Sequence, residues 1–253
     1  MQQDLPIERI RTTLLSSLAN CPRVIVTADP GSGKSTILPQ FFMTQGKKVV
    51  VAQPRRIAAR SLAKYVSQSF GEAPGQSIGY RVRHENCTSK TTQLEYVTDG
   101  MLVRLLQADP ELSEFDVVIL DEFHERSTDL DLCLALLMEL QSALRPELEL
   151  ILMSATLDTG HLSNWLKAPH LHAPGRPFPN HIERINTPIP RSKLTAEITK
   201  YILRTIKDQE TKNCLVFLPG VKDIESIHRQ LKGRTDIRIS QLYGQQKLTA
   251  QSQ

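Results

Sequence analysis

The residue types with the clearest chemical meaning lie in a glycine-rich run, ADPGSGKS at residues 28–35, which directly follows the apolar run RVIVT. Glycines lack a Cβ and let backbone N–H groups turn towards phosphate oxygens, and the N-terminus of a following helix attracts an anion. Lys34 would reach the β- and γ-phosphates of a nucleoside triphosphate, and Ser35 would ligate Mg²⁺. We therefore interpret the run as a phosphate-binding loop, against the alternative of a strand–turn–helix loop with a surface lysine.

This loop fits the pattern GxxxxGK[ST] except at its first position, where Ala28 stands in place of glycine. That position begins the loop and does not need to approach a phosphate closely. The loop residues that we assign to nucleotide binding are Ala28, Asp29, Pro30, Gly31, Ser32, Gly33, Lys34, Ser35 and Thr36.

A second reactive group, DEFH at residues 121–124, ends the apolar run DVVIL. An aspartate at a strand end can hold Mg²⁺, and a neighbouring glutamate can orient and deprotonate a water molecule. Alone, the group could equally be a helix N-cap cluster with a surface ion pair. Together with the loop it predicts a site in which Lys34, Asp121 and Glu122 act on a nucleoside triphosphate, with Ser35 and Asp121 as ligands of Mg²⁺.

These groups must be positioned by strands and helices that alternate along the first half of the chain. Apolar runs predict strands at residues 23–28, 47–53, 92–98, 116–121 and 148–154, and helical patterns are expected at residues 35–45, 57–70, 101–107 and 129–143. The last helix is apolar on almost every face, so we expect it to be well buried. Such alternation is typical of an α/β fold with a parallel sheet covered on both faces, where ligands bind at the carboxyl ends of the strands.

A change of composition separates this half from the rest of the chain. Six prolines lie between residues 169 and 191, and proline does not propagate a helix or a central strand. We expect a first domain over residues 1–175, a connector over 176–192 and the start of a second domain over 193–253. The elements expected in this second domain are a helix at 194–208, a strand at 214–220, a helix at 221–232 and a strand at 236–240.

Composition sets broad limits on the function. The 31 Lys and Arg residues against 27 Asp and Glu residues give a net charge of +4, which permits a polyanionic partner without requiring one. Aromatic residues are 5% of the chain, which argues against extensive stacking on bases. The four scattered cysteines indicate reduced thiols, and no signal peptide or membrane span is expected, so we expect a cytoplasmic protein. The sequence leaves its oligomeric state open.

The ordered motifs resemble those of the DEAH-box helicases of superfamily 2. The matching runs are ADPGSGKS (28–35), QPRRIAAR (53–60), GYRVRHEN (79–86), VTDGML (97–102), DEFHER (121–126), SAT (154–156) and LVFLPG (215–220). Many members carry alanine at the position of Phe123, whereas a bacterial subgroup of the family carries phenylalanine there, as this chain does. This resemblance implies a RecA-like P-loop NTPase domain followed by a partial second RecA-like domain, ATP with Mg²⁺ as the nucleotide, and single-stranded RNA as partner, with DNA not excluded.

The resemblance also implies roles for individual residues. His124 would couple ATP to the nucleic-acid side as part of the catalytic group, and Ser154 and Thr156 would link hydrolysis to strand movement, although both could instead cap the next turn. The residues expected near the RNA backbone are Arg55, Arg83, Thr98, Asp99 and Gly100. Arg55 could alternatively be a solvated helix start. Arg81 and Arg83 alternate on an expected strand and would face solvent or phosphate.

Two departures from the family pattern matter. Tyr65 occupies the position where many members have an arginine that stacks on adenine, and we include it as a nucleotide-binding hypothesis. The arginine-rich motifs expected further along do not occur. We therefore expect the N-terminal part of an ATP-dependent RNA helicase that binds ATP but hydrolyses it poorly, the alternative being an inactive nucleotide- and RNA-binding remnant. A GTPase or a transporter ATPase is disfavoured, because the NKxD and LSGGQ motifs are missing.

Overall fold

The computed structural model describes residues 5–155, 159–175, 181–185, 188–207, 213–233 and 237–243. The chain divides into two compact units, Met1–Pro179 and Asn180–Gln253, which are described separately. Within the described residues, no helix is both long and apolar enough to cross a membrane.

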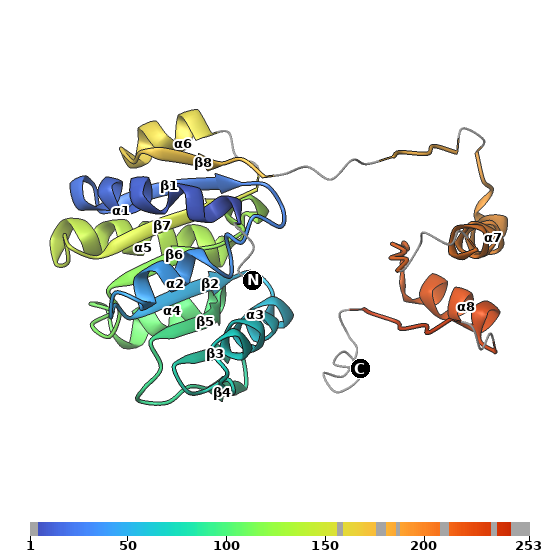
Figure 1. The fold of residues 1–253 in the computed structure, drawn as a ribbon, viewed down its shortest axis with the longest axis horizontal. Coiled ribbons are helices and arrows are strands. Elements are labelled where there is room, and N and C mark those ends of the chain that lie inside the picture. Colours follow the sequence, from blue (N-terminus) through green and yellow to red (C-terminus); the bar gives the residue numbers. More distant parts are fainter. Residues whose placement is uncertain are drawn as a thin grey trace. The chain divides into compact units, whose positions relative to one another are not determined.

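The first unit is built on one sheet with the strand order β4-β3-β5-β2-β6-β7-β1-β8 (Figure 1). Neighbouring strands are parallel except for β3 and β4, which form an antiparallel hairpin. The strands are β1 (Arg23–Ala28), β2 (Val49–Gln53), β3 (Ile78–Val82), β4 (Glu85–Cys87), β5 (Leu94–Thr98), β6 (Val117–Leu120), β7 (Glu149–Ser154) and β8 (His170–Ala173).

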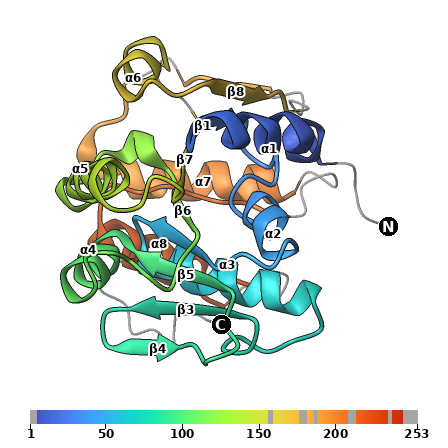
Figure 2. The same cartoon turned by 90° about the vertical axis from the view of Figure 1, so that its left-hand side faces the viewer.

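Helices cover both faces of this sheet. Those of the first unit are η1 (Pro6–Ile10), α1 (Arg11–Asn20), α2 (Leu38–Met43), α3 (Arg56–Ser69), α4 (Asp99–Ala108), η2 (Phe123–Glu125), α5 (Thr128–Ala143) and α6 (Thr159–Leu166). Figure 2 shows α1, α2 and α3 on one side of the sheet and α4 and α5 on the other.

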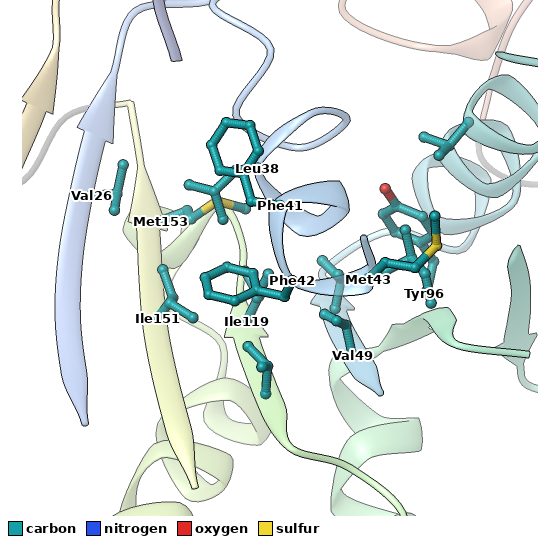
Figure 3. Close-up of a cluster of buried hydrophobic side chains, with 14 of the residues drawn as sticks. Val26, Leu38, Phe41, Phe42, Met43, Val49, Tyr96, Ile119, Ile151 and Met153 are labelled. Atoms are coloured by element: carbon teal, nitrogen blue, oxygen red, sulfur yellow. The ribbon is translucent and has the colours of Figure 1, made fainter. Parts of the chain in front are cut away.

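Alternate residues of each strand supply the two halves of the core, as the period of two in a strand requires. Val24 and Val26 of β1 pack with α1 and α2, whereas Ile25 between them packs with the cluster under α4 and α5. Figure 3 shows the first cluster, in which Phe41 and Phe42 of α2 lie over the strands. Because both faces are buried, the central strands are apolar throughout, which is why the sequence predicts them well.

All five strands expected in this half of the sequence are present, within two residues at each end. The helix expected at residues 35–45 begins only at Leu38, after turns at residues 34–37. Pro39 explains the delay, because proline has no N–H and fits only the first turn of a helix. α5 is less buried than expected, since Leu132 faces solvent while Leu130 and Leu134 are buried.

Six elements of the first unit were not expected from the sequence, namely η1, α1, β4, η2, α6 and β8. β8 lies among the prolines after residue 169 and pairs in parallel with the carboxyl half of β1. Arg83 is also placed differently from the expectation. β3 ends at Val82, so Arg83 lies in the turn that leads to β4 and does not alternate with Arg81 on the strand.

The second unit contains η3 (Arg191–Lys193), α7 (Leu194–Ile206) and α8 (Val221–Leu231), packed through a small cluster around Ile202, Ile227 and Leu231. The strands expected at 214–220 and 236–240 are wrong, because the described residues of both segments form no strand. An extended segment becomes a strand only when its backbone groups pair with a neighbour, and no described segment of this unit pairs with either one. Leu215 and Phe217 are accordingly 78% and 88% exposed.

Candidate nucleotide-binding and hydrolysis site

The glycine-rich loop lies at the carboxyl end of β1, and its glycines adopt backbone angles that other residues avoid. Gly31 has φ of 78° and Gly33 has φ of 91°, both in the left-handed region. The carbonyl of Gly33 accepts hydrogen bonds from the N–H groups of Thr36 (3.2 Å) and Ile37 (2.7 Å), which closes the turn that follows. Lys34 is carried on this turn with its side chain almost fully buried.

A buried tyrosine, which the sequence analysis did not identify as a site residue, stabilises this turn. In a continuing helix the carbonyl of Ser35 would accept from the N–H of residue 39, but residue 39 is a proline. The hydroxyl of Tyr96 instead donates to the Ser35 carbonyl at 2.9 Å. Tyr96 itself is fully buried on β5, so this bond ties the loop to the sheet.

The acidic pair follows β6, two strands away from β1 in the sheet. Asp121 is fully buried and accepts hydrogen bonds from the Gln53 side chain, from the Ser35 hydroxyl and from the backbone N–H of Glu122. Burial raises the pKa of Asp121, and the nearby Glu122 carboxylate adds to the rise, while Ser35 and Lys34 oppose it. Gln53 ends β2 and is a site partner that the sequence analysis missed.

Glu122 connects the loop to the acidic group. Its carboxylate oxygens lie 3.1 and 3.2 Å from the Lys34 ammonium nitrogen. Its backbone has φ of 51°, a strained value for a residue with a side chain. His124 Nδ1 lies 3.4 Å from a Glu122 oxygen and 3.2 Å from the Ser154 hydroxyl, so it contacts both the acidic motif and the end of β7. Thr156 falls outside the described residues.

The oxygen donors fit a hard cation. The Ser35 hydroxyl and the Asp121 carboxylate are hydrogen-bonded to each other, and both are ligand types that Mg²⁺ accepts. No group of three or more His, Cys, Asp or Glu side chains that could hold a metal is found in the described part of the chain. A magnesium ion here would therefore take its remaining ligands from water and from phosphate oxygens, as is usual for this ion.

A cavity of about 510 Å³ opens near the ends of β2 and β5. Four of the five residues expected near RNA line it, namely Arg83, Thr98, Asp99 and Gly100. Its full lining is Pro54, Arg56, Arg83, Thr98, Asp99, Gly100, Met101, Val103, Arg104, Gln107, Ser127 and Asp129. Asp99 is buried, which raises its pKa, and it accepts a hydrogen bond from Ser127 at 2.8 Å.

Arg55 is not among the lining residues. It forms an exposed ion pair with Glu125, at 2.9 Å, in the loop after β6. Its neighbour Arg56 lines the cavity instead and donates to the Arg83 carbonyl at 3.1 Å. Arg55 is the extended residue before α3 and Arg56 is the first residue of the helix, and the sequence alone did not show where the helix begins.

A family model of the DEAD/DEAH box helicases matches residues 9–163. The chain belongs to this family. The chain is 41% identical to ATP-dependent RNA helicase HrpB of Escherichia coli (strain K12) and 35% identical to the probable ATP-dependent RNA helicase DHR2 of Saccharomyces cerevisiae (strain ATCC 204508 / S288c). These matches cover 98% and 89% of the chain but 31% of each relative, so the chain spans about a third of their length.

Solved helicase structures match the fold as well. A crystal structure of Escherichia coli DEAH/RHA helicase HrpB superposes with a TM-score of 0.86 at 41% identity, over 98% of this chain and 32% of that one. A crystal structure of E. coli DExH-box NTPase HrpB gives 0.77 at 40% identity, over 100% and 32%. These findings confirm the family resemblance read from the ordered motifs and the predicted α/β fold of RecA-like type.

Three motifs of the first unit, at residues 28–35, 121–126 and 154–156, thus meet in space through their described residues. Lys34, Ser35, Asp121, Glu122 and His124 form one group of contacts, which Ser154 extends. Tyr65 lies on α3 with 63% of its surface exposed. Its predicted stacking on adenine, like the domain bounds expected from the prolines, stays a prediction.

Proposed function

We propose that this chain binds ATP with Mg²⁺ at the phosphate loop and hydrolyses it, as the ATPase part of a helicase that acts on single-stranded RNA. The observation that carries the proposal is the contact between Lys34 and Glu122, which come from loops two strands apart. The relatives named as ATP-dependent RNA helicases support ATP and RNA as the ligands.

Lys34 and the N–H groups of the loop bind the phosphates. In the structure the Lys34 ammonium pairs with Glu122. A triphosphate in the loop would compete for Lys34, and Glu122 would then accept a hydrogen bond from a water molecule and take its proton as the water attacks the γ-phosphorus. The bond from that phosphorus to the β–γ bridging oxygen breaks, and ADP leaves. Asp121 and Ser35 would hold Mg²⁺, which supplies neutralisation of the charge on the phosphate oxygens.

Contact with RNA falls to the arginine-lined cavity. Arg56, Arg83 and Arg104 offer guanidinium groups, and phosphate contacts of this kind position a nucleic acid without reading its sequence. His124 contacts both Glu122 and Ser154, the last residue of β7, so a shift at the end of β7 would reach Glu122 through His124. They are therefore the residues through which RNA would affect hydrolysis, together with Thr156, whose role stays a proposal from the motif alone.

The test is ATP turnover by the 253-residue chain with and without poly-uridine RNA, compared with Glu122→Gln and with Glu147→Gln as a control. Glu147 is an exposed residue paired with Arg145 away from the motifs. We expect slow turnover that RNA raises, that Glu122→Gln abolishes and that Glu147→Gln leaves unchanged. ATP binding without turnover under every condition would contradict hydrolysis and leave a nucleotide-binding module.

A further inference from the structure

The outer side of the phosphate loop is covered by the N-terminal segment of the chain. Ile7, in η1, is fully buried, and its backbone N–H donates to the carbonyl of Ser32 at 3.2 Å. The same segment is in contact with β8, the strand next to β1. The loop is therefore held between the sheet and a segment that precedes it by some 25 residues in the sequence.

Side chains of this segment meet the loop at its most restricted glycine. A Cβ placed on Gly33 would lie 3.0 Å from Leu5 Cδ1, 3.2 Å from Ile7 Cγ2 and 3.2 Å from Ile37 Cγ1. These atoms fill the space that a side chain on Gly33 would need, so they lie directly beside this residue. Gly33 has φ of 91°. Because glycine has no Cβ, its backbone can change to other conformations at little cost. We therefore attribute the observed conformation to the packing of Leu5, Ile7 and Ile37 around it.

The Ile7 bond also fixes the direction of one peptide group. The Ser32 carbonyl points towards Ile7, so the N–H of the same peptide unit, which belongs to Gly33, points the opposite way. Loops that bind phosphate do so with inward-facing N–H groups. The contact therefore holds the peptide in the orientation that phosphate binding requires.

We propose that Ile7 is a positioning residue for nucleotide binding, which keeps the Ser32–Gly33 peptide of the phosphate loop in its binding orientation without touching the nucleotide. This inference rests on the proposed function. The loss of the contact would let the loop populate other conformations, and the apparent affinity would fall in proportion to the remaining competent fraction.

The branched shape of Ile7 allows a sharp test. The Cγ2 methyl, which contacts Gly33, is kept in Ile7→Val and lost in Ile7→Leu, although leucine has the full volume of isoleucine. Ile7→Ala removes the methyl and the volume together. Leu14→Ala is the matched control, because Leu14 is fully buried in the same hydrophobic cluster but lies on α1.

The measurement is the Kd for ATP with Mg²⁺, by titration calorimetry on the full chain, beside the urea midpoint of each variant. We expect Ile7→Val to bind as the wild type does. Ile7→Leu and Ile7→Ala should weaken binding about tenfold, the change expected when the loop is competent about a tenth of the time. Leu14→Ala should lower the urea midpoint as much as Ile7→Ala does and leave the Kd unchanged.

Equal Kd values for Ile7→Leu and the wild type would overturn the inference, as would a Kd that follows the urea midpoint in all variants, Leu14→Ala included. Should Ile7→Ala fail to fold, the comparison of Ile7→Val with Ile7→Leu decides alone, because both keep the site filled with an apolar side chain. A wild-type chain that does not bind ATP would instead overturn the proposed function, which is a different result from equal binding by all variants.

Discussion

Replacing Tyr96 by phenylalanine tests how the sheet supports the phosphate loop. The change removes one hydroxyl, which donates to the Ser35 carbonyl, and leaves the buried ring in place. Pro39 cannot supply the N–H that this carbonyl would accept in a helix. The carbonyl therefore loses a partner that the chain does not readily replace.

The magnitude follows from the burial of the acceptor. Leaving a buried acceptor without a donor costs about 1–3 kcal/mol, and because Ser35 is only partly buried we expect the lower part of this range, about 1–2 kcal/mol. For a unit of this size each kcal/mol corresponds to a fall in Tm of about 2–4 °C. ATP binding should weaken as well, because Ser35 lies in the loop.

Urea unfolding followed by tryptophan fluorescence measures the effect, because Trp165 on α6 is the one tryptophan of the sequence and belongs to the first unit. Tyr80→Phe is the control, since the Tyr80 hydroxyl lies 3.5 Å from Glu85, a weak contact whose loss should change stability by less than about 0.5 kcal/mol. If Tyr96→Phe is no less stable than Tyr80→Phe, the account of the loop given above is wrong.

Two further substitutions test the charges of the first unit. Asp121→Asn should abolish ATP turnover and yet raise stability at pH 7, because burial raises the pKa of Asp121 and so disfavours its ionised form in the folded state. Urea unfolding at pH 7 and pH 5 checks this: wild-type stability should gain on acidification relative to Asp121→Asn, and a less stable variant at pH 7 would contradict it. His170 and His172 both contact the Thr27 hydroxyl, at 2.7 and 3.0 Å, and burial together with His172 lowers the pKa of His170 below its ordinary 6.5. The unfolded chain therefore takes up this proton first, so stability should be full above pH 6.5 and fall as the pH drops through the folded pKa; thermal unfolding between pH 7.5 and 5 should show a smaller fall in His170→Gln.

The sequence could predict the central strands and the meeting of Lys34 with Asp121 and Glu122 for one physical reason. A strand buried on both faces must be apolar along its whole length, and the reactive residues follow such strands directly. The carboxyl ends of parallel strands share one edge of the sheet, so groups far apart in sequence arrive together. This part of the site needs no knowledge of side-chain packing.

Other elements could not be predicted, because they form through contacts with a neighbouring element and their own residues show no clear strand or helix pattern. β8 is a short edge strand, HLHA, in which only Ala173 is buried. It forms because β1 offers an unpaired edge beside it. The contact of Ile7 with the loop likewise depends on the route of the N-terminal segment. The opposite error occurred at residues 214–220. Their apolar pattern predicted a strand, but the described residues contain no partner strand for them.

The charges of the site constrain how Lys34 can bind phosphate. Lys34 is buried, and a buried ammonium without a counter-charge is costly. Glu122 supplies that charge here, and a triphosphate would supply it in the bound state. Under the proposed function, phosphate at Lys34 would take over this role and would leave the Glu122 carboxylate to accept a proton from water.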